Sequence, residues 1–136
     1  MMLKRTFVAV SDIEGVGVFA AEPIKAGDLI WTLDTEFDRL VDQSKLDDYP
    51  EHMREFFTRY AYPFHKVPNL LVLEVDNGRF MNHSTAPNTR FDEITLGYAT
   101  RDINIGEELL CDYGEFDPSY ELVPNLSHLK CKASLE

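Results

Sequence analysis

Short apolar segments that alternate with glycine-bearing turns restrict the folds open to this chain. Six of them have strand length and contain β-branched or aromatic residues. They are RTFVAV (5–10), GVGVFAA (15–21), DLIWTL (28–33), LLVLEV (70–75), TLGYAT (95–100) and ELLCDY (108–113). None approaches the roughly 20 apolar residues that a membrane-spanning helix needs. The pattern predicts a mainly β fold built from short strands.

One segment, DDYPEHMREFFTRYAY (47–62), has helical spacing instead. Asp48 is a candidate N-cap, Pro50 suits a first helical turn, and Glu51 lies where a capping box requires an acid. An apolar stripe follows at helical intervals, formed by Tyr49, Met53, Phe56 and Tyr60. We therefore expect one helical insert, over about residues 44–62, in the middle of the chain.

Two segments resemble each other: AAEPIKAGDLIWTLD, from Ala20, and ATRDINIGEELLCDY, from Ala99. Each runs from alanine through polar residues to an isoleucine, a glycine, an acid and an apolar strand. The shared pattern predicts a turn at Gly27 and another at Gly106, each leading into a strand. Two copies do not establish a repeat architecture.

Composition narrows the possible partners. The 136 residues fit a single domain, with 44% hydrophobic residues for a core and a net charge of −11. That charge argues against direct nucleic-acid binding and favours either a basic partner or simple solubility. Cys111 and Cys131 are too few for a secreted disulfide scaffold, so we expect a cytoplasmic protein with no membrane segment.

Three motifs contain residues suited to binding or chemistry. In EGVGVFA (14–20), Gly15 and Gly17 allow either a hairpin turn or the close approach of a ligand. RFMNHSTAPNTRF (79–91) places Asn82, with a donor and an acceptor, before His83. In GEELLCDYGEFD (106–117), Tyr113 follows a predicted strand, where it is either a packed core residue or a cavity-facing one.

Other chemistries are disfavoured by spacing. The four histidines, His52, His65, His83 and His128, lack metal-ligand spacing, and no CxxC pair accompanies them. Ser84 and His83 are adjacent, and neighbours on a strand point to opposite faces, so a catalytic Ser–His pair is doubtful.

In order and spacing, the three motifs resemble those of the SET-domain protein lysine methyltransferases. The family pattern is a GxG, then R-F-x-N-H-S-x-x-P-N, then G-E-E-L-x-x-D-Y-G, matched here by residues 15–17, 79–88 and 106–114. The resemblance implies a β-clip-like fold of several small sheets with a knot-like C-terminal crossing. The SET core would span about 5–116 of a single domain (1–136), with 117–136 as a C-terminal lid or tail.

The resemblance also implies S-adenosylmethionine as cofactor and a set of site residues. The cofactor-binding residues would be Gly15, Val16, Gly17, Arg79, Asn82, His83, Tyr113 and Phe116. Tyr113 matches the catalytic tyrosine, expected to orient the reacting groups rather than act as a base. Cys111 and Tyr98 would set substrate or product specificity, and the small Cys111 side chain leaves room for higher methylation.

Two departures from the family pattern are visible. Thr85 stands where members with a zinc module have a cysteine, so we expect no metal, and Phe116 or Tyr120 would then cover the adenine. WTLDTE replaces the usual Y-x-G-E element, which puts the substrate groove in doubt.

The expected reaction is methylation of a lysine in a basic protein such as a histone, nucleoid or ribosomal protein. The acidic run DTEFDRLVDQSKLDDYPE (34–51) suits such a partner, although an ordinary solvated face is as good an explanation. The enzyme would be cytoplasmic, or nuclear or host-nuclear if it modifies histones, and a homodimer is possible. The alternatives are a non-catalytic SET-like binding module and a hydrolase built on His83 and Cys111.

Overall fold

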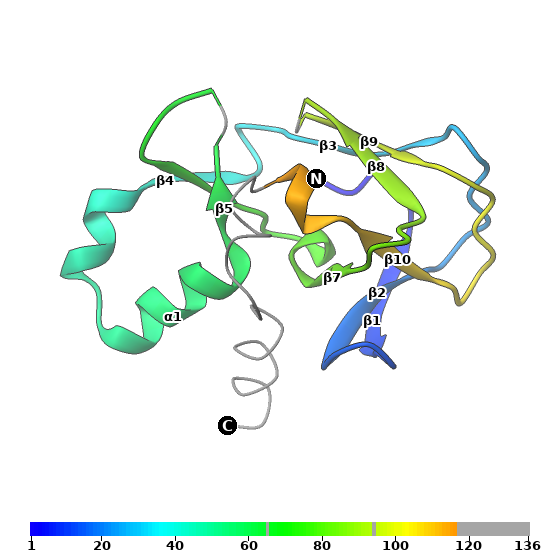
Figure 1. The fold of residues 1–136 in the computed structure, drawn as a ribbon, viewed down its shortest axis with the longest axis horizontal. Helices are drawn as coiled ribbons and strands as arrows, with labels where there is room; N and C mark the ends of the chain where they lie inside the picture. Colours follow the sequence, from blue (N-terminus) through cyan, green and yellow to red (C-terminus); the bar gives the residue numbers. More distant parts are fainter. Residues whose placement is uncertain (65, 94, 117–136) are drawn as a thin grey trace.

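Three small β-sheets form the scaffold of the chain in a computed structural model that describes residues 1–64, 66–93 and 95–116 (Figure 1). The strands are β1 (Thr6–Val10), β2 (Val16–Ala20), β3 (Leu29–Thr32), β4 (Arg39–Asp42), β5 (Tyr62–Pro63), β6 (Leu70–Leu73), β7 (Asn82–His83), β8 (Thr89–Asp92), β9 (Leu96–Ala99) and β10 (Glu108–Cys111). The helices are α1 (Glu51–Tyr60) and the 3-10 turns η1 (Gln43–Asp48), η2 (Asn77–Phe80) and η3 (Tyr113–Glu115). The predicted mainly β architecture of small sheets is confirmed.

The sheet that positions the site has the strand order β1-β2-β10-β7. β10 pairs antiparallel with β2 and parallel with β7, where Leu110 lies opposite Asn82 and Cys111 opposite His83. The other two sheets have the orders β3-β9-β8 and β4-β6-β5. The expected crossing of these two segments requires β7 and β10 to lie side by side, and the structure has this pairing.

All six predicted strands form, within one or two residues of their expected ends. Four others, β4, β5, β7 and β8, were not predicted because they are short and mostly polar or aromatic. β8 is half-buried, with Thr89 and Phe91 facing inward and Arg90 and Asp92 outward.

The predicted helical insert is present, but Asp48 does not cap it. Asp48 ends η1, and α1 begins at Glu51 after Pro50, with no side-chain cap. The proline explains the difference, because it holds the preceding Tyr49 in an extended conformation (φ −90°, ψ 151°) and excludes it from the helix. The expected stripe was also incomplete, since the buried aromatic residue of α1 is Phe57. Figure 1 places this insert at one end of the molecule, beside β4 and β5.

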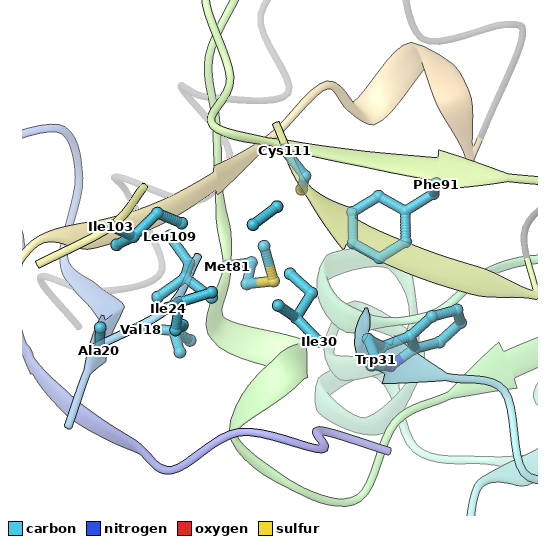
Figure 2. Close-up of a cluster of buried hydrophobic side chains, with 11 residues drawn as sticks. Val18, Ala20, Ile24, Ile30, Trp31, Met81, Phe91, Ile103, Leu109 and Cys111 are labelled. Atoms are coloured by element: carbon cyan, nitrogen blue, oxygen red, sulfur yellow. The ribbon is translucent and has the colours of Figure 1, made fainter. Parts of the chain in front are cut away.

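The hydrophobic core lies between the two sheets that contain β10 and β3 (Figure 2). Its fully buried members come from several elements and include Val18, Ile24, Ile30, Trp31, Ile103 and Leu109. Trp31 packs edge-on against Phe91, with ring centroids 5.4 Å apart. In the described part of the chain, no helix is long and apolar enough to cross a membrane.

Candidate active site around β7 and β10

The GxG segment forms the end of the β1–β2 hairpin, as its glycines allowed. Gly15 adopts a positive φ of 49°, and its carbonyl accepts a hydrogen bond of 2.9 Å from the Ser11 N–H. Val16 is 40% exposed at the start of β2. Gly17 is tightly enclosed, because a Cβ built on it would lie 2.0 Å from Glu108 Oε1.

Asn82 joins the second motif to this hairpin. Its side chain is buried, and Nδ2 lies 3.1 Å from the Glu14 carbonyl and 3.1 Å from the Val16 carbonyl. Nδ2 also lies 2.9 Å from Glu108 Oε1 on β10. Residues that are far apart in the sequence therefore meet around one amide.

Tyr113 is held against the same segment by two hydrogen bonds. Its N–H donates to His83 Nδ1 at 3.0 Å, and its hydroxyl donates to the Met81 carbonyl at 2.5 Å. Because Nδ1 accepts, the His83 ring carries its proton on Nε2 in this arrangement. A hydroxyl whose proton is held by a carbonyl keeps acceptor capacity on its oxygen, which suits orienting an amine better than removing its proton.

The Pro-Asn turn after His83 also contributes to the site's framework. Asn88 is buried, and its side chain donates to the Glu108 carbonyl and accepts from the Leu110 N–H, both at 2.8 Å. Thr89 donates to the Leu110 carbonyl at 2.7 Å. These bonds occupy backbone groups of β10 in the manner of a neighbouring strand. They therefore fix the position of β10 along its own axis relative to Asn82.

The two expected specificity residues lie apart. Cys111 is buried in the core, with Sγ 3.9 Å from the Asn82 carbonyl. Tyr98 lies on β9 between the inward-facing Gly97 and Ala99. The Arg90 guanidinium carbon stacks over its ring, 4.8 Å from the ring centroid. Alternate strand residues face opposite sides, so Tyr98 points away from the core that contains Cys111.

Arg79 and Phe116 contact aromatic residues. The Arg79 guanidinium lies 4.5 Å from the Phe80 ring centroid, and its Nη1 donates to the Val75 carbonyl at 3.4 Å. Phe116 packs against Phe91 at 4.5 Å and Tyr62 at 5.0 Å, on the edge of the core. These neighbours occupy at least part of the ring surface that an adenine lid would need, and Tyr120 lies outside the described residues.

Two carboxylates near the core were not predicted as functional. Glu108 accepts hydrogen bonds from Ser11 and Asn82, and strand alternation in GEELL could have indicated it, because an acid on that strand requires partners. Glu74 ends the apolar run LLVLE and is buried. Its pKa is raised to about 8, mainly by burial, and the nearby Asp38 carboxylate acts in the same direction.

Among the residues that the structure describes, no group of three His, Cys, Asp or Glu side chains could hold a metal ion. The expected lack of zinc remains a prediction, because Cys131 and His128 lie outside those residues.

The chain matches a family model described as the SET domain over residues 15–114. It is 32% identical over 120 residues to the histone-lysine N-methyltransferase set1 of Dictyostelium discoideum, covering 81% of this chain and 8% of that protein. It is 34% identical over 116 residues to the probable histone-lysine N-methyltransferase set-23 of Caenorhabditis elegans, covering 74% of this chain and 46% of that protein. The chain thus spans less than half of these relatives.

Solved structures show the same fold. A chain of the Chaetomium thermophilum Polycomb Repressive Complex 2 bound to GSK126 superposes with a TM-score of 0.65 at 24% identity, over 92% of this chain and 17% of that one. A chain of a PRC2 complex in an autoinhibited conformation, bound to S-adenosylmethionine, gives a TM-score of 0.63 at 22% identity, over 92% of this chain and 16% of that one.

Proposed function

Because the chain belongs to the SET-domain family, we propose that it is a protein lysine N-methyltransferase that uses S-adenosylmethionine. The observation that carries this proposal is the parallel pairing of β7 with β10. That pairing brings Asn82 and His83 next to the end of the strand that leads to Tyr113. The names of the relatives, all histone-lysine methyltransferases, support the same reaction.

The residues at the hairpin fit a cofactor with an amino-acid end. The Asn82 side chain makes its hydrogen bonds through Nδ2, and among the described residues none donates to its Oδ1. That oxygen is a suitable acceptor for an ammonium group. Gly15, Val16, Gly17, Arg79, Asn82, His83, Tyr113 and Phe116 are the proposed cofactor-binding residues. When bound, S-adenosylmethionine supplies an electrophilic methyl group on a sulfonium.

Methyl transfer requires the substrate lysine as a free amine, although lysine is protonated at neutral pH. We expect the proton to leave to solvent before transfer, since a low-dielectric environment disfavours the ammonium. With S-adenosylmethionine bound, the amine nitrogen would form the new N–C bond as the S–C bond breaks, and the electron pair of the S–C bond would stay on sulfur, leaving S-adenosylhomocysteine. The role of Tyr113 is to hold the amine in line with the methyl group through its hydroxyl oxygen.

Higher methylation is the product we propose, from the small size of Cys111. A small residue two positions before the catalytic tyrosine leaves volume for a methylated amine. Mass spectrometry of the modified lysine after long incubation is expected to reveal dimethyl or trimethyl product. Monomethyl product alone would show that neighbouring side chains fill the space. Tyr98 is proposed as a second specificity residue, acting from the outer face of its sheet.

The proposed substrate is a basic protein, with a histone as the first choice and nucleoid or ribosomal proteins next. The net charge of −11 favours such a partner. A histone substrate would place the protein in a nucleus and a ribosomal one in the cytoplasm. We also propose a homodimer, with no direct binding to nucleic acid or to a membrane. The alternative function is a non-catalytic SET-like module that binds protein.

Calorimetric titration with S-adenosylmethionine tests the cofactor. We expect saturable binding by the wild type, loss of binding in Asn82→Ala, and unchanged binding in the control Asn104→Ala. A folded wild type that does not bind, even with a basic peptide present, would favour the non-catalytic alternative.

Methyl transfer to core histones and basic peptides tests the reaction. Tyr113→Phe is expected to lower the rate by at least about a hundredfold, because loss of orientation at the reacting atoms has effects of this size. Tyr49→Phe makes the same chemical change at an exposed tyrosine of the insert and should leave the rate unchanged. Equal rates for wild type and Tyr113→Phe would contradict the assigned role.

A further inference from the structure

A continuous hydrogen-bond chain runs beneath the GxG hairpin and is centred on Glu108. The Ile13 N–H donates to Ser11 Oγ at 3.0 Å, and the Ser11 hydroxyl lies 2.9 Å from each Glu108 carboxylate oxygen. Asn82 Nδ2 completes the chain by donating to Glu108 Oε1 at 2.9 Å. Ser11 and Asn82 are both buried, so the carboxylate is satisfied by partners that cannot easily be replaced by water.

This chain fixes which way the Asn82 amide faces. Nδ2 is surrounded by three acceptors, namely the Glu14 carbonyl, the Val16 carbonyl and the Glu108 carboxylate. An amide turned by 180° would place Oδ1 against the same three acceptors and would lose every one of these hydrogen bonds. The only arrangement that satisfies the group therefore presents Oδ1 on the opposite side.

Glu108 also accounts for the second glycine of the motif. A Cβ on Gly17 would lie 2.0 Å from Glu108 Oε1, 2.8 Å from its Cδ and 3.2 Å from Asn82 Nδ2. Gly17 is a strand residue without a positive φ, so the absence of a side chain serves packing rather than backbone freedom. The carboxylate occupies the space that any other residue would fill.

We propose that Glu108 is a positioning residue, acting through Asn82, that prepares the site to accept the ammonium group of the cofactor's amino-acid end. This inference rests on the proposed function. Donation of the amide N–H to a carboxylate polarises the amide and makes Oδ1 a better acceptor. Because both N–H groups of the Asn82 amide are already used, its Oδ1 can accept a hydrogen bond from a donor group of the ligand. An acceptor group of a ligand at the same place would be repelled.

The test compares binding of two nucleosides by calorimetry, with competition titration for the weaker one. One is S-adenosylhomocysteine, and the other is its deaminated analogue, in which hydrogen replaces the α-ammonium. Glu108→Ala is expected to weaken S-adenosylhomocysteine binding about tenfold and to change binding of the deaminated analogue less than about twofold. A merely structural defect would weaken both alike, so this pairwise coupling isolates the ammonium.

Two further variants complete the test. Glu108→Gln keeps an acceptor for Asn82 and should stay within about threefold of the wild type for both nucleosides. Glu107→Gln removes the same charge from the half-buried neighbouring residue, which pairs with Arg101, and should leave both affinities unchanged. Should Glu108→Ala fail to fold, Ser11→Ala replaces it, with an expected loss of about threefold for S-adenosylhomocysteine alone.

Each result decides the matter. Equal weakening of both nucleosides, or no weakening of either, overturns the role of Glu108 while leaving the proposed function intact. Failure of the folded wild type to bind S-adenosylhomocysteine overturns the proposed function and this inference with it.

Discussion

The two similar segments of the chain, Ala20–Asp34 and Ala99–Tyr113, fold into nearly the same turn and then perform different tasks. Gly27 and Gly106 have φ values of 86° and 87°, each in a turn closed by a 3.0 Å backbone hydrogen bond. Asp28 accepts the Lys25 N–H and Glu107 accepts the Asn104 N–H, both at 3.0 Å. In each case this backbone N–H is the main cause that lowers the pKa of the acid.

The two turns also face each other. Ile24 and Ile103 form an antiparallel bridge, with hydrogen bonds of 3.0 and 2.8 Å, and both are buried. The Gly106 N–H donates to the Ala20 carbonyl, and the Gly27 N–H donates to the Ala99 carbonyl, both at 2.8 Å. The internal similarity of the sequence thus has a structural counterpart at the centre of the core.

The strands that follow differ in their neighbours. β3 pairs with β9 and contains Trp31, which is buried in the core. β10 lies between β2 and β7, so its Glu108 reaches the hairpin and the following Tyr113 reaches His83. At the matching position of the first segment stands Leu29, which is 37% exposed. The same turn thus serves packing in one segment and the site in the other.

The largest effect on stability is expected in the first of the two segments, whose strand β3 packs into the core. Trp31→Ala should lower the free energy of unfolding by about 4 kcal/mol, because it removes a large and fully buried side chain. Leu110→Ala, at the matching position of β10, should cost about half as much, since Leu110 is half-buried. Urea unfolding measures both. Equal costs would show that the two strands contribute alike to the core.

A smaller effect concerns Glu74, the buried acid near β3. Its pKa of about 8 in the folded protein exceeds the ordinary value of 4.5, and Asp38, Asp76 and the Met1 amino group are the charged groups around it. The folded state therefore holds a proton that the unfolded state releases. The contribution of Glu74 to stability should therefore be fully present below pH 4.5 and should be lost as pH rises through about 8.

Glu74→Gln should remove this fall and raise the unfolding free energy at pH 8.5 by on the order of 3 kcal/mol. At pH 5 the variant and the wild type should be nearly equal. Glu107→Gln, at an acid whose pKa is lowered below its ordinary value, is the control and should leave the slope between pH 5 and 8 unchanged. Thermal melts across this range measure the effect, and parallel curves for wild type and Glu74→Gln would contradict it.

The smallest effect tests the similarity itself. Gly27→Ala and Gly106→Ala should each cost about 1 kcal/mol from backbone strain, since no atom lies within 4 Å of an added Cβ at either position. The two losses in urea unfolding should agree within about half a kcal/mol. A much larger loss for Gly106→Ala would mean that the second turn has a further role in the site.

Much of the fold could be predicted from local patterns. Apolar runs between glycines located six strands, because alternation and β-propensity act within a few residues. The start of α1 was misplaced, because the effect of Pro50 on Tyr49 outweighed the capping pattern at Asp48. β7 escaped prediction because two residues contain no periodicity, and only its neighbour β10 makes them a strand.

Some residues of the candidate site could likewise be predicted from the sequence, and others could not. Gly15, Asn82, His83 and Tyr113 could be found from motif order, and the structure brings them together. Strand alternation could have marked Glu108 as an acid that requires partners, but the sequence did not identify its partner Ser11, which lies 97 residues away. Tyr98 and Cys111 were grouped by expectation, yet they face different sides of the structure.

The sequence alone determined the strand segments, the two glycine turns and the ordered motifs that identify the family. Each depends on residue type and short spacing, which local conformational preferences decide. Only the tertiary structure decided that β10 lies between β2 and β7, and that Glu108 therefore sits beneath Gly17 beside Asn82. Strand order is set by pairing between distant segments, whose free energy depends on the whole packed core rather than on any one stretch of chain.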